Sequence, residues 1–111
     1  MNSLFITGTD TDVGKTYVAA GLAVTFRKMG IDVGVMKPFA AGTEQKRGFK
    51  SEDVEILSNA AQVNDPEILL NPQFFPISAS PYTALNNLKI KPNIELILNR
   101  FKQLSKLHSI I

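Results

Sequence analysis

A glycine-containing segment near the amino terminus has the residue types and spacing of a phosphate-binding loop. It reads Gly8-Thr-Asp-Thr-Asp-Val-Gly14-Lys15-Thr16. In such a loop, backbone N–H groups and the start of the next helix point at one anion, and the helix dipole adds positive potential. Lys15 would reach the outer phosphates of a nucleotide, and the Thr16 hydroxyl is a suitable Mg²⁺ ligand. The segment therefore predicts a site for nucleotide phosphates and a metal ion.

The spacing of this loop differs from the common motif, because five residues instead of four separate Gly8 from Gly14. A glycine-rich turn that only caps a helix is the structural alternative. The flanking pattern favours phosphate binding, since residues 3–7 form a β-compatible run that predicts a buried first strand. After Lys15, apolar residues recur every three or four positions as far as Met29, and Gly30 follows where a helix would end.

The remaining elements predict a parallel βαβ unit followed by shorter pieces. Residues 31–36 predict a second strand that ends at Pro38, which has no N–H for a ladder, and residues 40–50 predict a loop. Ser51 can cap a helix with an acidic first turn. Five prolines between residues 65 and 92 predict short segments and turns, residues 94–104 predict an amphipathic helix, and residues 109–111 predict the opening of a strand.

These elements predict an α/β fold, a P-loop NTPase-like parallel sheet with flanking helices that is incomplete in this chain. Residues 1–111 would form the N-terminal part of a single nucleotide-binding domain. Two strands and the beginning of a third offer too little sheet surface to cover the helices. We therefore expect exposed apolar surface, which favours self-association or a complementary C-terminal half.

Composition excludes several other classes. Twelve Lys and Arg against ten Asp and Glu give a net charge of +2, and the basic residues are scattered, so nucleic acid is not an expected partner. Without cysteine the chain has no disulfide, thiolate metal site or cysteine nucleophile, and one histidine excludes a histidine metal cluster. The apolar run at the amino terminus is too short for a signal peptide or a membrane span, so a cytoplasmic location is expected.

The loop, taken together with Lys37-Pro-Phe-Ala-Ala41-Gly at the end of the second strand, resembles the dethiobiotin synthetase family. The family's loop has the same lengthened form, and its Lys-Pro motif, an Asp at the position of Asp53 and a segment like Ser80-Pro81 are all present. The resemblance runs over essentially the whole chain but over only about half of a member's length. The family's Glu-Gly-Ala-Gly-Gly segment would follow Ile111.

The resemblance implies an ATP- and Mg²⁺-dependent cyclo-ligase. This enzyme closes a cyclic urea on 7,8-diaminononanoate with CO₂, through a carbamate that ATP phosphorylates. Family members are homodimers. Lys15 and Lys37 would supply positive charge where the carbamate and the phosphoryl group carry negative charge.

The other roles are also assigned by the resemblance alone. Nucleotide contacts fall on Asp12, Val13, Gly14, Lys15, Thr16, Tyr17 and Asp53. Substrate contacts fall on Thr11, Asp12, Lys37 and Ala41, and metal contacts on Thr16 and Asp53. Ala41 departs from the family, because many members have a serine there that contacts the substrate.

Each of these residues also has a simpler structural interpretation. Lys37 could be a solvated strand end, and Asp53 could be a first-turn acid favoured only by the helix dipole. Tyr82 and the Phe74-Phe75 pair are interpreted as packing residues. His108 is expected at the surface before a strand, with no assigned role.

Two other functions stay open at this point. One is a non-catalytic nucleotide-binding or assembly fragment, and the other is a relative of the cobyrinate-type amide synthases. Partition ATPases are disfavoured, because Asp10 stands where they carry a second lysine.

Overall fold

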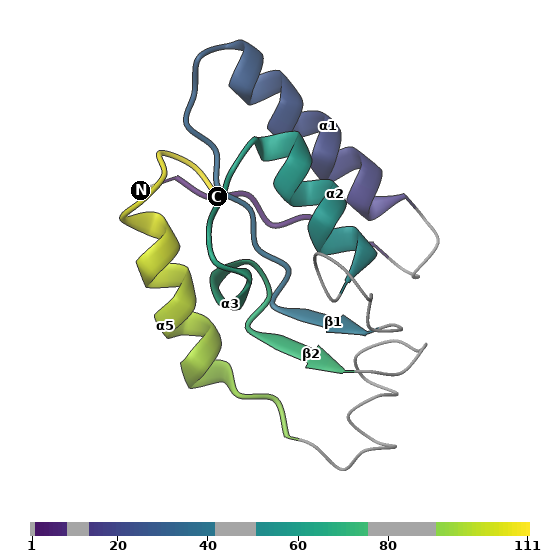
Figure 1. Cartoon of the computed structure of the whole chain (residues 1–111), viewed down its shortest axis with the longest axis vertical. Coiled ribbons are helices and arrows are strands. Elements are labelled where there is room, and N and C mark those ends of the chain that lie inside the picture. The colour runs from purple at the N-terminus through teal and green to yellow at the C-terminus, as the bar shows by residue number, and fades with distance from the viewer. Residues whose placement is uncertain (1, 9–13, 42–50, 76–90) are drawn as a thin grey trace.

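The computed structural model describes residues 2–8, 14–41, 51–75 and 91–111 of the chain. Figure 1 shows the arrangement of its helices and strands along these segments. The elements are α1 (Lys15–Lys28), β1 (Phe39–Ala41), α2 (Glu52–Ala61), α3 (Glu67–Leu70), β2 (Gln73–Phe75) and α5 (Ile94–Ser105).

Helix α1 begins immediately after Gly14 and ends at Lys28, as its apolar periodicity predicts. Gly30 has a positive φ of 79°, and its N–H donates to the Arg27 carbonyl at 2.9 Å, so it closes the helix as expected. Arg27 and Lys28 lie in the last turn, where the helix dipole favours cations.

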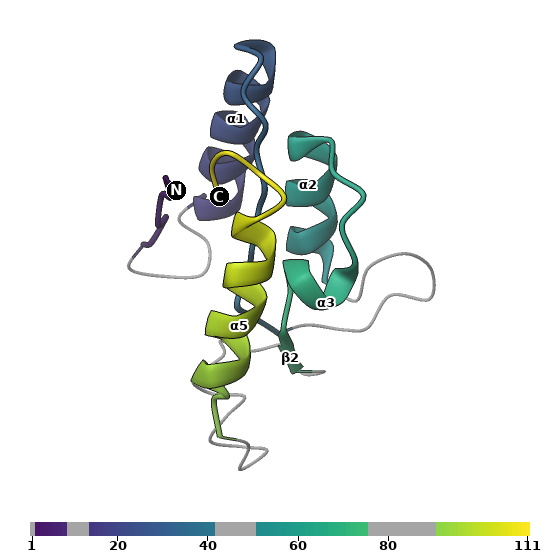
Figure 2. The same cartoon turned by 90° about the vertical axis from the view of Figure 1, so that its left-hand side faces the viewer.

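Helix α2 packs against α1, and both views show the two helices side by side (Figure 2). Ser51 occupies its N-cap position and acidic residues fill its first turn, as predicted, although the Ser51 side chain makes no capping hydrogen bond. The core between the two helices and the strands is made of small and medium apolar side chains. It contains Ala23, Val33, Ala40, Val54, Ala61, Val63 and Leu70.

The end of the chain lies between two earlier segments. Ile110 forms parallel bridges with Asn2 on one side and with Val33 on the other. The Leu4 N–H donates to the Ile111 carbonyl at 2.9 Å and the Gly34 N–H donates to the Ile110 carbonyl at 2.7 Å. The predicted strand opening at residues 109–111 is therefore confirmed as a strand-like pairing.

The first predicted strand, residues 3–7, is only partly formed. Its described pairing is limited to the contacts of Asn2 and Leu4 with residues 110 and 111. Leu4 and Phe5 are exposed, so the prediction of a buried strand is wrong for this chain. Among the described residues, the backbone hydrogen bonds between this segment and residues 110 and 111 lie along one of its edges. Burial on both faces of a parallel strand requires covering layers that the described elements do not provide here.

The second predicted strand is displaced along the chain. Residues 31–36 form only the Val33 bridge, and the regular strand β1 begins after Pro38 and includes the start of the predicted loop. β1 pairs in parallel with β2, with Phe39 opposite Gln73. Pro38 has no N–H to donate, but its carbonyl accepts from the Gln73 N–H at 3.2 Å, so it stands at the entry of the strand instead of at its end.

The proline-rich stretch forms short elements, α3 and β2, where it is described, as predicted. Helix α5 follows with Asn93 as its N-cap, whose side-chain oxygen accepts from the Leu96 N–H at 3.1 Å. Its apolar face buries Ile97 and Leu104. Figure 1 shows α5 on the opposite side of the extended segments from α1 and α2. None of the helices in the described segments is long and apolar enough to cross a membrane.

Candidate phosphate-binding site

The start of α1 has the geometry that an anion site requires. Gly14 is in the left-handed conformation, with φ 88° and ψ 19°, and its carbonyl accepts the first helical bond from the Val18 N–H at 3.0 Å. The N–H groups of a first helical turn have no acceptor within the helix and point out of its end. No acidic residue lies in the first turn of α1, so the positive potential there is not offset by a helix side chain.

Glycine is required at position 14 by its backbone conformation. A β-carbon placed on Gly14 would meet no atom within 4 Å, so the space around it is open. The positive φ is what disfavours other residues. An anion site needs both open space and an exposed backbone, and the surroundings of Gly14 are consistent with such a site.

Lys37 comes to the same region from the segment before β1. Its N–H donates to the Leu70 carbonyl at 2.7 Å, and its carbonyl accepts from the Asn71 side-chain amide at 2.8 Å. Its ammonium group forms an ion pair with the Asp53 carboxylate in the first turn of α2. The interpretation of Lys37 as a solvated strand end is therefore wrong: its side chain is 27% exposed and is held by a partner.

The same contact assigns a second role to Asp53. Its carboxylate is not merely a helix-terminal charge, because it binds the ammonium group of a candidate catalytic lysine. Its side chain keeps 42% exposure, which leaves part of the carboxylate accessible.

Asn71 belongs to this arrangement and was missed by the sequence reasoning. The side chain is buried, and its amide donates to the Lys37 carbonyl and, at 3.0 Å, to the Gln73 carbonyl. It lies between the short helix α3 and Pro72, a turn position at which an asparagine side chain commonly bonds the backbone. That local pattern is the signal that could have identified it.

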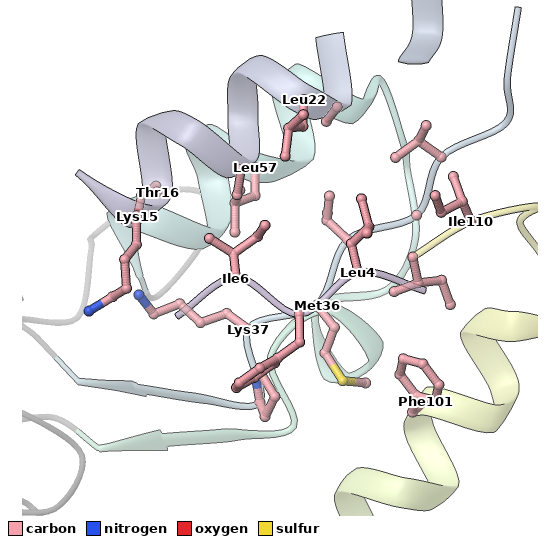
Figure 3. Close-up of a pocket in the computed structure, with 18 of the residues that line it drawn as sticks. Leu4, Ile6, Lys15, Thr16, Leu22, Met36, Lys37, Leu57, Phe101 and Ile110 are labelled. Carbon is pink, nitrogen blue, oxygen red and sulfur yellow. The ribbon is translucent and has the colours of Figure 1, made fainter. Parts of the chain in front are cut away.

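A cavity of about 430 Å³ lies beside the start of α1 and Lys37. Its walls are mostly apolar side chains from the N-terminal segment, α1, the segment before β1, and α5. Lys15, Thr16 and Lys37 also line it, and Figure 3 shows the amino groups of the two lysines pointing to the same end of the cavity. The structure thus joins three of the predicted site residues in one cavity, and Asp53 is connected to them through Lys37.

The remaining predicted residues are placed less fully. Tyr17 lies in the first turn of α1 with its side chain exposed, and Ala41 is the last residue of β1, opposite Phe75 in the register. Thr11, Asp12 and Val13 lie outside the described residues, as do Ser80, Pro81 and Tyr82. Phe75 is confirmed as a packing residue, because it is buried and its ring is stacked on Phe39 with 6.4 Å between centroids.

His108 is not the surface residue that was expected. Its side chain is 9% exposed, with Nδ1 at 2.9 Å from an Asp32 oxygen and Nε2 at 2.6 Å from an Asp65 oxygen. The sequence offered no signal for this, because the three residues are far apart in the chain and meet only in the folded structure.

Comparisons with known proteins identify the family to which the chain is similar. A family model described as "AAA domain" matches residues 2–109. The chain is 73% identical over all of its 111 residues to an ATP-dependent dethiobiotin synthetase of Nitrosopumilus maritimus, and the match covers 49% of that protein. It is 34% identical over 107 residues, or 96% of this chain and 44% of the relative, to the protein of that name in Caldicellulosiruptor bescii. It is 33% identical over 108 residues, or 97% of this chain and 45% of the relative, to the one in Bacillus licheniformis. The chain spans about half the length of the curated relatives it matches.

Proposed function

The chain belongs to the AAA domain family, and on that premise we propose that it is the phosphate-binding half of an ATP-dependent dethiobiotin synthetase. One observation carries the proposal: Lys15 at the start of α1 and Lys37 before β1 line the same cavity. The first would contact nucleotide phosphates, and the second would face the reacting group. The similarity to dethiobiotin synthetases over the whole chain supplies the substrate class.

In the proposed reaction, one amine of 7,8-diaminononanoate takes up CO₂ as a carbamate. A carbamate oxygen attacks the γ-phosphorus of ATP and ADP leaves. The second amine then attacks the carbonyl carbon, expels phosphate and closes the cyclic urea. Negative charge develops at the carbamate and at the phosphoryl oxygens, and the two lysines would stabilise it by fixed positive charge without forming a covalent intermediate.

Two side chains near Lys37 carry oxygen atoms of the kind that Mg²⁺ prefers. Thr16 lines the cavity and Asp53 lies beside it through Lys37, and hydroxyl and carboxylate oxygens are ligands that Mg²⁺ prefers. When bound, Mg²⁺ would neutralise phosphate charge. Because the Asp53 carboxylate binds Lys37, metal coordination by Asp53 would compete with this ion pair.

The proposal extends to partners and location. We propose that the site is completed either by a C-terminal half like that of the relatives or by a second copy of the chain in a homodimer. We also propose that the protein works in the cytoplasm. Thr11, Asp12 and Ala41 are proposed substrate contacts, with Val13 and Tyr17 beside the nucleotide. A non-catalytic nucleotide-binding fragment is the alternative outcome of the test.

The test is ADP release from ATP with Mg²⁺, bicarbonate and 7,8-diaminononanoate. It is run on the chain alone and on the chain supplied with the C-terminal half of the Nitrosopumilus relative. We expect ADP release that requires both the diamine and the added half, with dethiobiotin identified by mass spectrometry. Nucleotide binding without any diamine-dependent ADP release in the completed protein would instead indicate a binding fragment.

A further inference from the structure

The single histidine of the chain joins three parts of the fold at the end of α1 opposite Gly14. His108 follows α5 and precedes the strand-like residues 109–111. Asp32 follows α1, and Asp65 lies in the connection between α2 and α3. Both imidazole nitrogens contact a carboxylate oxygen, at 2.9 Å for Asp32 and 2.6 Å for Asp65.

The two contacts specify the charge on the ring. A neutral imidazole has one N–H donor and one lone pair, whereas an ionised carboxylate only accepts hydrogen bonds. Two carboxylates can therefore both be satisfied only by the imidazolium, which donates from Nδ1 and Nε2. In the neutral form, one ring nitrogen would face a carboxylate oxygen with no proton between them.

Three charged residues of the described structure contact the ring or its carboxylate partners. Asp32 comes from the turn after α1 and Asp65 from the α2–α3 connection. Arg27 of α1 binds the same Asp32 oxygen at 3.1 Å and also donates to the Val33 carbonyl at 3.0 Å and to the Ala61 carbonyl. Arg27 and His108 thus share one oxygen of Asp32, and the Arg27 guanidinium helps to hold this carboxylate in place.

The backbone beside the ring leaves space for it, because position 34 is a glycine. A β-carbon on Gly34 would lie 2.5 Å from Cδ2 and 2.9 Å from Cγ of His108. The imidazole thus fills the space that any other residue at position 34 would need. The Gly34 N–H donates to the Ile110 carbonyl, so the ring lies directly beside the pairing of residues 109–111.

We propose that the His108 imidazolium is a pH-sensitive latch that holds residues 109–111 between the N-terminal segment and residues 32–34. The Asp32 carbonyl accepts from the N–H groups of Ser109 and Ile110 at 3.0 and 3.2 Å, so the latch and this pairing share a residue. This proposal does not depend on the proposed function, because the latch lies at the opposite end of α1 from Gly14. α1 is 14 residues long, so its two ends lie about 20 Å apart.

The direction of the pH effect follows from the ring's surroundings. Burial disfavours the imidazolium, but hydrogen bonds and charge from Asp32 and Asp65 outweigh it, and the pKa of His108 is raised. Stabilisation is then complete below the ordinary histidine pKa of about 6.5 and is lost as the pH rises through the raised pKa. The hydrogen bond from His108 lowers the pKa of Asp32, so this carboxylate is lost as a partner only in more acidic solution.

The first test is the NMR titration of the histidine ring, which gives one set of signals because the chain has one histidine. We expect a midpoint above that of the same chain in urea. Asp65→Asn and Asp32→Asn should each lower the folded-state midpoint. A midpoint in the native chain at or below the value in urea would overturn the proposal.

The second test asks whether the ring controls the pairing, and it needs no variant. Amide exchange is measured across the histidine titration and corrected for its intrinsic pH dependence. Protection of the Leu4 and Gly34 amides, which bond residues 111 and 110, should fall with the histidine midpoint. The Val18 amide, bonded to Gly14 at the far end of α1, is the control and should not follow it. Unchanged protection of Leu4 and Gly34 through the titration would contradict the latch.

Discussion

Lys37 is fixed at three points, and each point constrains a different part of the residue. Leu70 accepts its N–H, the Asn71 amide binds its carbonyl, and Asp53 binds its ammonium group. A flexible lysine side chain loses conformational entropy at several rotatable bonds when it acts on a substrate. Holding the residue before substrate arrives reduces that loss, which is the benefit expected for a charge that stabilises a transition state.

Replacement of Lys37 tests whether this charge acts on turnover. In the chain completed with the C-terminal half, Lys37→Ala should lower kcat about a hundredfold, the effect of losing roughly 3 kcal/mol of transition-state stabilisation. Nucleotide affinity should change little, because the phosphates are expected at α1. Steady-state ADP release and calorimetry measure the two effects separately, with Lys91→Ala as the control. An unchanged kcat would show that Lys37 has only a structural role.

Asn71 gives a stability prediction for the buried turn that holds Lys37. Asn71→Ala removes the donor to two carbonyl groups, and leaving a buried acceptor unsatisfied costs about 1–3 kcal/mol. We expect the free energy of unfolding in urea to fall by about 2 kcal/mol. Asn59→Ala on the exposed side of α2 is the matched control and should be nearly neutral. Equal stability of the two variants would mean that the Asn71 hydrogen bonds contribute nothing.

At the scale of elements, α1 offers a comparison between two glycines. Gly14 precedes the helix with a positive φ, whereas Gly21 lies in its interior, and a β-carbon would fit at both positions. Gly14→Ala should cost about 1–2 kcal/mol through the left-handed conformation. Gly21→Ala should add about 0.5–1 kcal/mol, because alanine loses less backbone entropy in a helix. Urea unfolding measures both, and destabilisation by Gly21→Ala alone would contradict this assignment.

The helices could be predicted from sequence because their signals are local. α1 and α5 repeat apolar residues every three or four positions, and Gly30 marks a helix end that the structure reproduces. The strands could be predicted only roughly. Whether residues 31–36 or 39–41 form the regular ladder depends on β2, more than thirty residues later in the chain, and short parallel strands carry little local information.

The candidate site shows the same division. Lys15, Thr16 and Lys37, which the loop and the Lys-Pro motif single out, line one cavity. The roles of Asn71 and His108 depend on partners distant in sequence, Lys37 for the first and Asp32 and Asp65 for the second. These tertiary contacts have no periodic or spacing signature. The turn pattern before Pro72 is a local signal for a buried Asn71, but it does not identify Lys37 as the partner, and His108 has no such signal.

At the scale of the whole molecule, large apolar side chains remain exposed in the described part of the chain. Phe5 is 86% exposed and Tyr17 is 74% exposed. Tyr17 and Val24 lie on one outward face of α1, because positions seven residues apart are two helical turns apart, and Val18 is exposed next to Tyr17. Contiguous apolar surface of this kind favours association with another protein surface.

This surface predicts self-association of the chain. Light scattering should give a mass above 12.2 kDa at micromolar concentration, and Tyr17→Ser with Val18→Ser should move it toward the monomer. Addition of the C-terminal half of the relative should replace the self-associated form by a defined complex. A monodisperse monomer over the whole concentration range would show that the exposed face does not drive association.

The central claim is that the start of α1 binds nucleotide phosphates, and calorimetry with Mg²⁺ and ATP tests it most directly. Titration into the chain, into Lys15→Ala and into Lys28→Ala compares the first and last residues of the same helix. We expect Lys28→Ala to bind like the wild type. Lys15→Ala should bind at least about tenfold more weakly, since a hydrogen bond to a charged group contributes about 1.5–3 kcal/mol. Wild-type affinity in a folded Lys15→Ala chain would contradict the claim.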